Sequence, residues 1–207
     1  RHVGIDLAIN MRTIVSKMGA FKIRMLTALV GAKITAGRDT DGRGNFFDVG
    51  ITESRLGDKY EMEYDLDLVR ALGASAAEPY PDLLMTDSDI KNISAMLIKN
   101  GISDDDILIG VHPGGKPSHR WPVERFAETI NEIAKNVKAK FVITGDKTDV
   151  LLAEAIKRSS GADILNTTGM LSTGELAAVI KQCDLYICND TAPMHMAAIL
   201  KVPLVAI

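Results

Sequence analysis

Short apolar segments alternate with longer amphipathic segments through the second half of this 207-residue chain, and this order constrains the fold more than any other feature. In the segment 123–137 the apolar residues recur at helical spacing and so keep to one face. The pattern predicts strands at 107–111, 140–144, 163–165, 185–188 and 203–207, with helices at 123–137, 148–159, 173–182 and 193–200. Strands that alternate with such helices form parallel sheets covered on both faces. We therefore expect an α/β fold with a doubly wound parallel sheet.

The first half alternates less regularly. It predicts strands at 3–8 and 33–36, helices at 13–30, 60–72 and 88–100, and a Gly- and Asp-rich loop that runs to residue 57. A Pro-bearing stretch at 78–84 predicts a linker. We expect one domain over residues 1–85, linker included, and a second over 86–207. Because the chain opens on Arg1 beside a strand pattern and stops on another strand pattern, we expect a fragment of a longer protein.

Composition places the chain among cytoplasmic proteins. With 46% hydrophobic residues it can bury a core, no apolar run approaches the ~20 residues of a membrane span, and no signal segment opens the chain. Cys183 and Cys188 are its only cysteines, and we expect them to be buried in a reducing compartment. The sequence contains no metal-ligand cluster and no G-x-G-x-x-G fingerprint. We therefore expect no metal and no cofactor, and a dehydrogenase or epimerase is disfavoured.

Charge is unevenly distributed. Residues 1–45 hold eight Lys or Arg against three Asp, a net charge of +5, which leaves −8 for the remainder. A basic first segment fits an anionic partner such as a phosphorylated substrate or a membrane surface. The alternative is a solvated helix face with scattered basic residues. Only ten residues are aromatic, and they form no platform with basic residues, so no nucleic-acid partner is expected.

The stretch 189–195 joins a strand-like run directly to a helix-like run. The free N–H groups of a helix's first turn, with the positive end of its dipole, form an anion site. Thr191 suits the N-cap and Pro193 the first helical turn. Asp190 and His195 bracket this site with an acceptor and a titratable group. The alternative is an ordinary capped helix with a solvated Asp and a packed His.

The loop after strand 107–111 is expected at the same edge of the sheet. Gly114 and Gly115 allow the backbone to approach a phosphate closely, and Lys116, His119 and Arg120 supply positive charge.

A third loop follows strand 140–144. It carries Gly145, Asp146 and Asp149, and a carboxylate at this place often binds the ribose hydroxyls of a nucleotide. Capping of the next helix is the alternative role for both carboxylates.

From about residue 107 onward, these loops and their order resemble glycosyltransferase family 9, the ADP-heptose:lipopolysaccharide heptosyltransferases. The residues that carry the resemblance are His112-Pro113-Gly114, Arg120-Trp121-Pro122 with Phe126, Gly145, Thr168-Gly169, Leu176-Ala177 and the run from Asn189 to Ala198. The first half fits more loosely, through Ile5-Asp6-Leu7, Arg38, Asp65-Leu66-Asp67-Leu68 and Leu72-Gly73.

The resemblance implies a GT-B fold of two Rossmann-like domains, both incomplete in this chain, with the acceptor on 1–85 and the nucleotide sugar on 86–207. It implies a donor-binding set of Gly114, Gly115, Lys116, His119, Arg120, Gly145, Asp146, Thr168, Gly169, Met170, Asp190, Thr191, Ala192 and His195. In this set, the residues of 190–195 hold the diphosphate and sugar, the basic residues before Trp121 counter the phosphates, and the backbone of 168–170 meets the adenine.

Two positions depart from the family pattern. Ala192 stands where a Gly is usual, which requires a negative φ, and His119 stands where a Lys is common, which shifts the positive charge to Lys116 or Arg120. The family's general base is an Asp that would precede residue 1. No catalytic residue is therefore assigned within this chain.

The implied activity is an inverting, metal-independent transfer of heptose from ADP-heptose to the lipopolysaccharide inner core. Such a transfer needs a base for the acceptor hydroxyl and stabilisation of the departing diphosphate. The implied partners are an ADP-sugar donor and an anionic lipopolysaccharide or glycolipid acceptor, with peripheral contact at the inner face of the inner membrane. The alternative is a nucleotide-sugar-binding module, or an inactive relative without transferase activity.

Overall fold

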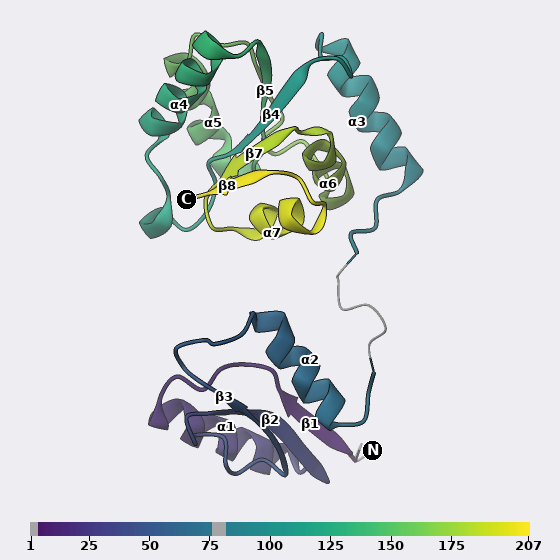
Figure 1. The fold of residues 1–207 in the computed structure, drawn as a ribbon, viewed down its shortest axis with the longest axis vertical. Coiled ribbons are helices and arrows are strands. Elements are labelled where there is room, and N and C mark those ends of the chain that lie inside the picture. Colours follow the sequence, from purple (N-terminus) through teal and green to yellow (C-terminus); the bar gives the residue numbers. More distant parts are fainter. Residues whose placement is uncertain (1–3, 76–81) are drawn as a thin grey trace. The chain divides into compact units, whose positions relative to one another are not determined.

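The computed structural model describes residues 4–75 and 82–207, and the chain divides into two compact units (Figure 1). Unit 1 comprises Arg1–Pro79 and unit 2 comprises Tyr80–Ile207. Most of the linker expected at 78–84 lies outside the described residues. Within the described ranges, no helix is long and apolar enough to cross a bilayer.

Unit 2 is built on a five-stranded parallel sheet with the order β6-β5-β4-β7-β8. Figure 1 labels β5, β4, β7 and β8 of this sheet. Its strands are β4 (Ile107–His112), β5 (Ala139–Ile143), β6 (Ile164–Asn166), β7 (Leu185–Cys188) and β8 (Leu204–Ala206). Its helices are α3 (Asp87–Lys99), α4 (Val123–Asn136), α5 (Val150–Ser159), α6 (Thr173–Gln182) and α7 (Ala192–Ile199), with 3-10 turns η1 (Pro117–His119) and η2 (Lys147–Asp149). The chain starts in the middle at β4, winds outward to β6, and returns past β4 to β7. The expected doubly wound parallel sheet is confirmed.

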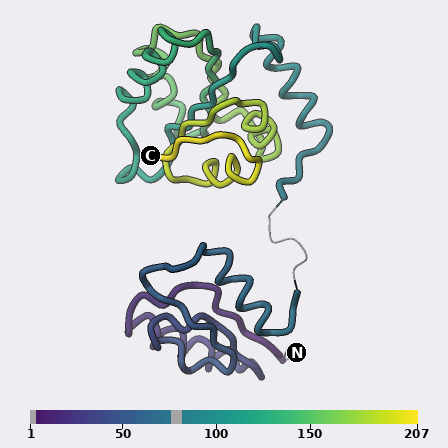
Figure 2. Tube along the Cα trace, in the orientation of Figure 1, coloured from purple at the N-terminus to yellow at the C-terminus, as the bar shows by residue number. Residues whose placement is uncertain are grey.

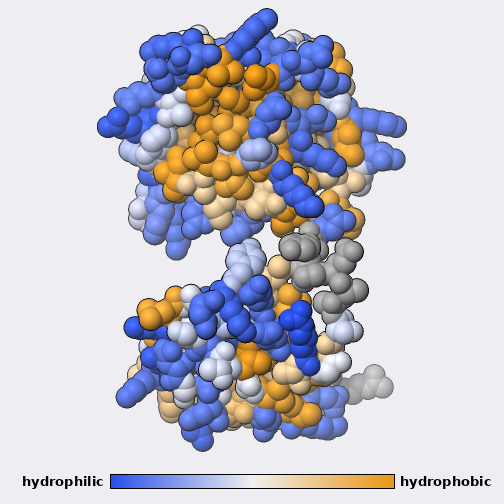
Figure 3. All heavy atoms as spheres, in the orientation of Figure 1, coloured by the Kyte–Doolittle hydropathy of each residue, from blue (hydrophilic) through white to orange (hydrophobic). Residues whose placement is uncertain are grey.

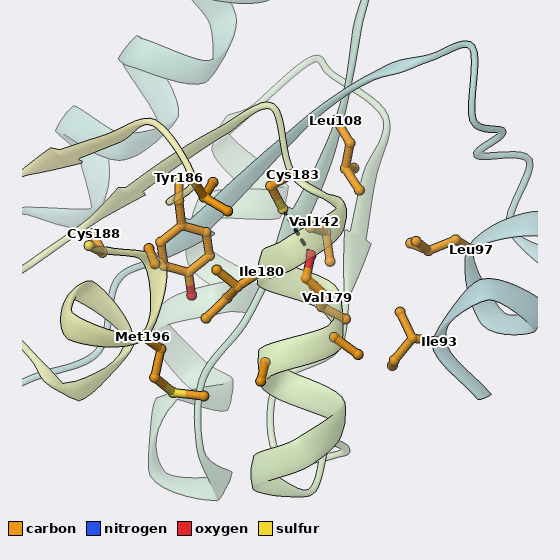
Figure 4. Close-up of a cluster of buried hydrophobic side chains, with 14 of the residues drawn as sticks. Ile93, Leu97, Leu108, Val142, Val179, Ile180, Cys183, Tyr186, Cys188 and Met196 are labelled. Carbon is orange, nitrogen blue, oxygen red and sulfur yellow. Dashed lines mark hydrogen bonds between the residues drawn. The ribbon is translucent and has the colours of Figure 1, made fainter. Parts of the chain in front are cut away.

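Each face of this sheet carries its own hydrophobic core, because alternate strand residues point to opposite faces. On one face, Leu108 and Tyr186 pack with residues of α3, α6 and α7 (Figure 4). On the other face, Ile109 and Val111 pack with residues of α4 and α5. Gly110 lies between them in β4 because a Cβ at that position would collide with the ring of Tyr186. The two cores fix the sheet from both sides and leave its carboxyl edge to the loops.

Unit 1 holds a three-stranded parallel sheet with the order β1-β2-β3, whose path Figure 2 traces. Its elements are β1 (Leu7–Asn10), α1 (Lys17–Val30), β2 (Ile34–Thr40), β3 (Val49–Glu53) and α2 (Glu61–Ala71). Ser16 caps α1 by accepting a hydrogen bond from the N–H of Gly19, and Gly31 ends the helix in the left-handed region at φ 65°.

Two expectations for unit 1 are wrong. Among the described residues the first strand is Leu7–Asn10, whereas the expected strand ended at residue 8, and β3 lies inside the stretch expected to be a loop. Gly50 interrupts the apolar pattern of β3. Together with the Gly- and Asp-rich turn before it, this gives the segment the composition of a loop, so the sequence did not predict a strand. Pairing with β2, from Ala36 opposite Val49 to Thr40 opposite Glu53, creates this strand.

A fully buried arginine joins the elements of unit 1. The Arg38 guanidinium, on β2, pairs with Glu53 of β3 at 2.9 Å and with Glu61 of α2 at 2.6 Å, and it also pairs with Asp65. Burial lowers the pKa of Arg38, but its hydrogen bonds to Asp65, Glu61 and Glu53 outweigh burial and raise it. Glu53 is buried as well and accepts a further hydrogen bond from Thr40. The charge is therefore part of the core of this unit.

We expect Arg38→Met to destabilise unit 1 by about 3–5 kcal/mol, because it leaves Glu53 buried without its counter-charge. Hydrogen exchange of the β2 amides in increasing urea measures this unit separately from unit 2. The double variant Arg38→Met/Glu53→Gln removes both charges and should recover much of the loss. Unchanged exchange in Arg38→Met would show that the buried pair contributes nothing to stability.

Candidate functional site

The sheet of unit 2 changes direction between β4 and β7, and the loops that follow these strands leave its carboxyl edge side by side. Parallel α/β sheets bind ligands at this topological switch point. A pocket of about 470 Å³ lies here, lined by His112, Gly115, Gly145, Asp146, Lys147, Asp149, Gly169, Leu171, Ser172, Thr173, Leu176, Thr191, Ala192 and Pro193. Two smaller pockets, of about 150 and 220 Å³, lie at the beginnings of the strands. Its position at the carboxyl edge therefore makes the largest of these three pockets the candidate ligand site.

Three residues of this pocket lining carry backbone N–H groups without a hydrogen-bond acceptor among the described residues. In the described part of the chain, no acceptor receives the N–H of Gly115, Gly145 or Thr191. Ala192 begins α7, and its φ is not positive, as the departure from the family's Gly requires. Unpaired donors at a helix N-terminus attract anions. The pocket can therefore bind an anionic group without a cationic side chain at its centre.

Thr191 occupies the expected N-cap position of α7, but its side chain makes no capping hydrogen bond. Its hydroxyl donates to the carbonyl of Asn189 at 3.1 Å and accepts nothing from the first turn. The hydroxyl has turned back along the loop, so it does not satisfy the first-turn N–H groups of α7. Because no side chain caps α7, the N–H groups of its first turn remain available to a ligand.

The side chain of Asn189 holds two of the loops together. Its amide nitrogen donates to the carbonyls of Pro113 and Gly114, both at 2.9 Å, and its amide oxygen accepts the N–H of Trp121 at 3.0 Å. Asn189 is 1% exposed, so these partners cannot be replaced by water without rearrangement. One side chain thus fixes the loop after β4 against the loop after β7.

Arg120 holds the same loop from its other side. Its Nε donates to the carbonyl of Gly115 at 2.6 Å, and its guanidinium pairs with the buried Asp149 at 3.2 Å. The positive charge of Arg120 is therefore directed into the loop and toward η2. Lys116 and His119 are exposed and lie outside the pocket lining, whereas Lys147 of η2 contributes to it.

The two carboxylates after β5 form a capping box. Asp146 accepts from the N–H and hydroxyl of Thr148, both at 2.6 Å, and Asp149 accepts the N–H of Asp146 at 3.1 Å. The hydrogen bonds from Thr148 lower the pKa of Asp146. Capping, one of the two roles expected for this pair, is confirmed. Both residues nevertheless line the pocket, so capping and ligand contact are not exclusive here.

His112 ends β4 at the floor of the pocket. The side chain is 7% exposed, and its Nδ1 lies 3.2 Å from the hydroxyl of Thr144, which in turn lies 2.6 Å from that of Tyr186. Burial lowers the pKa of His112, and the neighbouring Asp149 and Asp146 only partly oppose this. The imidazole is therefore neutral at pH 7 and can act as a hydrogen-bonding group.

The structure brings together six of the fourteen residues expected to bind donor: Gly115, Gly145, Asp146, Gly169, Thr191 and Ala192 line the pocket. Gly114, Arg120 and Thr168 lie outside the lining and are buried or half-buried. Exposed positions outside the lining hold Lys116, His119, Met170, Asp190 and His195. The expected set omitted His112, Lys147, Asp149, Leu171, Ser172, Thr173, Leu176 and Pro193.

One sequence signal could have found part of the omitted group. Ser172 and Glu175 form a capping box at the start of α6. The S-x-x-E spacing marks a helix N-terminus, and this helix starts at the same carboxyl edge as α7. No local pattern marks Lys147 or Leu171, because their place in the pocket depends on how the loops pack.

The fold and the pocket define a doubly wound α/β protein with a pocket at its switch point, where unpaired backbone N–H groups suit an anionic ligand. Residues 4–207 match glycosyltransferase family 9 (heptosyltransferase), and the chain belongs to that family. It is 28% identical over 155 residues to the lipopolysaccharide heptosyltransferase 2 of Salmonella typhimurium, covering 70% of this chain and 43% of the relative.

Solved structures agree on the fold. A family 9 glycosyl transferase from Veillonella parvula superposes with a TM-score of 0.73 at 24% identity, covering 99% of this chain and 57% of that one. The ADP-heptose lps heptosyltransferase II of E. coli superposes with a TM-score of 0.62 at 19% identity, covering 97% and 61%. These likenesses confirm the GT-B type α/β fold. The chain spans about half the length of the relatives it matches.

We expect Asn189→Leu to lower the free energy of unfolding of unit 2 by about 1–3 kcal/mol, because it leaves buried backbone groups unpaired. It should also change the emission of Trp121, the single tryptophan, whose ring packs edge-on against Phe126. Asn131→Leu is a matched control, since Asn131 also binds backbone, at Ser159 and Gly161. Identical emission in both variants and the wild type would contradict the proposed role of Asn189 in fixing the two loops.

We also expect unit 2 to lose stability as the pH falls below about 6.5, the ordinary pKa of histidine. The pKa of folded His112 is lower than this, so the unfolded chain takes up the proton first and acid favours unfolding. Urea unfolding at about pH 7 and about pH 5 should show a larger loss in the wild type than in His112→Asn. Equal losses would place His112 in a solvated environment.

Proposed function

We propose that unit 2 binds the nucleotide-sugar donor of a heptosyltransferase, and that the intact protein transfers heptose from ADP-heptose to the lipopolysaccharide inner core. Membership of family 9 supports the class of reaction. The observation that carries the proposal is the convergence of unpaired N–H groups from the loops after β4, β5 and β7 on one pocket. Such donors suit a diphosphate.

In this proposal the donor's diphosphate lies against Gly115, Thr191 and the N-terminus of α7. These N–H groups stabilise the charge that develops on the departing diphosphate, and they need no reorganisation during the reaction. Lys147 supplies the nearest lining cation, a role that the sequence had assigned to Lys116, His119 or Arg120. Arg120 instead holds the loop in place through Gly115.

The remaining roles follow the family resemblance. The backbone of 168–170 would meet the adenine, and Asp190 and His195 would reach the sugar, since both are exposed beside the start of α7. Asp190 makes no side-chain hydrogen bond within the described residues, so it does not serve as a cap. Unit 1 would face the acceptor, an anionic lipopolysaccharide or glycolipid, with peripheral contact at the cytoplasmic face of the inner membrane.

Calorimetry with ADP and ADP-heptose, with and without EDTA, tests donor binding. We expect equal affinities with and without EDTA, because in the described residues no three His, Cys, Asp or Glu side chains are grouped to hold a metal ion. Asp190→Ala should weaken ADP-heptose binding by about 1.5–3 kcal/mol, the value of a charged hydrogen bond, and leave ADP binding unchanged. GDP- and UDP-sugars serve as controls.

Binding that collapses in EDTA would contradict the metal-free mechanism. Equal losses for ADP and ADP-heptose in Asp190→Ala would remove Asp190 from the sugar site. Transfer of labelled heptose to a lipopolysaccharide acceptor by the intact protein separates the transferase from a module that only binds donor.

A further inference from the structure

The basic residues near the start of the chain divide into two groups. One group is neutralised within unit 1, through ion pairs of Lys33 with Asp6, Arg43 with Asp41, and Arg38 with its three carboxylates. The other group has no carboxylate partner among the described residues and is exposed: Arg12, Lys17, Lys22 and Arg24. Three of these four lie on α1, which contains no acidic residue. The excess positive charge is therefore concentrated on one helix.

The same helix exposes an apolar ridge, formed by Met18, Phe21, Met25 and Leu29. These side chains are 63%, 58%, 49% and 79% exposed, respectively. They follow one another at spacings of three and four residues, so they lie along one face of the helix. The partly buried residues Gly19, Ala20, Ile23 and Thr27 occupy the opposite face. The apolar ridge therefore points away from the body of unit 1.

The cations flank this ridge on both sides. At 3.6 residues per turn, Lys17 and Arg24 lie along one side of the apolar ridge, and Lys22 lies along the other, next to the exposed Leu26. An exposed apolar ridge with basic residues on both sides is the pattern of a helix that lies in the plane of a membrane interface. Long basic side chains bury their stems beside apolar surface and keep their charges at the headgroups.

We propose that α1 docks on an anionic lipid bilayer, with the apolar ridge in the headgroup–acyl boundary and Lys17, Lys22 and Arg24 against lipid phosphates. A second copy of this chain is a poorer occupant, because α1 against α1 would bring six positive charges together with no acid between them. The inference rests on the proposed function only in that a glycolipid acceptor places the enzyme at a membrane.

Sedimentation of the full chain with vesicles tests this docking without substrate, so its outcome is independent of transferase activity. Vesicles of equal parts phosphatidylglycerol and phosphatidylethanolamine should bind the protein, and phosphatidylcholine vesicles should bind it much less. Each basic side chain near an anionic surface contributes about fivefold to binding. Lys17→Gln/Lys22→Gln/Arg24→Gln should therefore weaken binding roughly 100-fold at low salt, and high salt should reduce this difference.

A matched charge control removes three cations from unit 2, in Lys157→Gln/Arg158→Gln/Lys181→Gln, and should leave vesicle binding unchanged. For the apolar ridge, Phe21→Ser should weaken binding by about tenfold or more, since it removes the largest inserted side chain. Leu151→Ser, at a position that is 81% exposed on α5, is the corresponding apolar control. Both test positions are exposed, so these variants should fold normally.

Cysteine labelling reports directly on the apolar ridge. Cys183 and Cys188 are buried, and burial raises their pKa values to about 12 and about 11, so neither reacts readily with maleimide. Phe21→Cys should label rapidly in buffer and slowly with phosphatidylglycerol vesicles. Equal labelling with and without vesicles would overturn the proposal. Slow labelling in buffer, or self-association that Phe21→Ser abolishes, would also overturn it, because another protein segment would then cover the ridge.

Discussion

The candidate site depends on one buried amide. Asn189 meets the Pro113 and Gly114 carbonyls and the Trp121 N–H with the two ends of a single planar group, so it requires the loops after β4 and β7 to adopt one relative position. Sheet pairing brings these loops together, since His112 lies opposite Cys188 at the end of the ladder. Strand pairing alone fixes β4 and β7 relative to each other, but it leaves the loops that follow them free to move. The amide removes that freedom on the pocket side.

The sequence predicted the elements of unit 2 well because their periodicity is local. The strand at 185–188 is found at its predicted bounds, and the helix predicted at 123–137 ends one residue earlier, at Asn136. Unit 1 was harder, because β3 becomes a strand only through β2. The same limit applies to Arg38. The sequence only counted it toward the positive charge of residues 1–45 and the family resemblance, whereas three carboxylates distant in sequence make it part of the core.

The residues predicted to bind the donor show the same difference between local and long-range information at the level of single side chains. Three of the four predicted glycines, Gly115, Gly145 and Gly169, line the pocket, and Gly114 does not. The predicted basic side chains, Lys116, His119 and Arg120, lie outside the lining, because a loop sequence does not determine the direction of its side chains. Arg120 turns inward to Gly115 and Asp149, while the positive charge in the lining comes from Lys147. Thr191 has the right residue type for a cap, but its hydroxyl donates to the carbonyl of Asn189 instead.

A pocket built from backbone donors places particular demands on a sequence. It needs residues without side chains where loops approach one another: a Cβ at Gly115 would lie 2.9 Å from the Cγ2 atom of Thr191, and one at Gly145 would lie 2.9 Å from the Cβ atom of Asp149. It places fewer demands on the identity of its exposed side chains, because the N–H groups are the same for every residue type except proline. Position of the main chain, more than choice of side chain, then determines where an anion can bind.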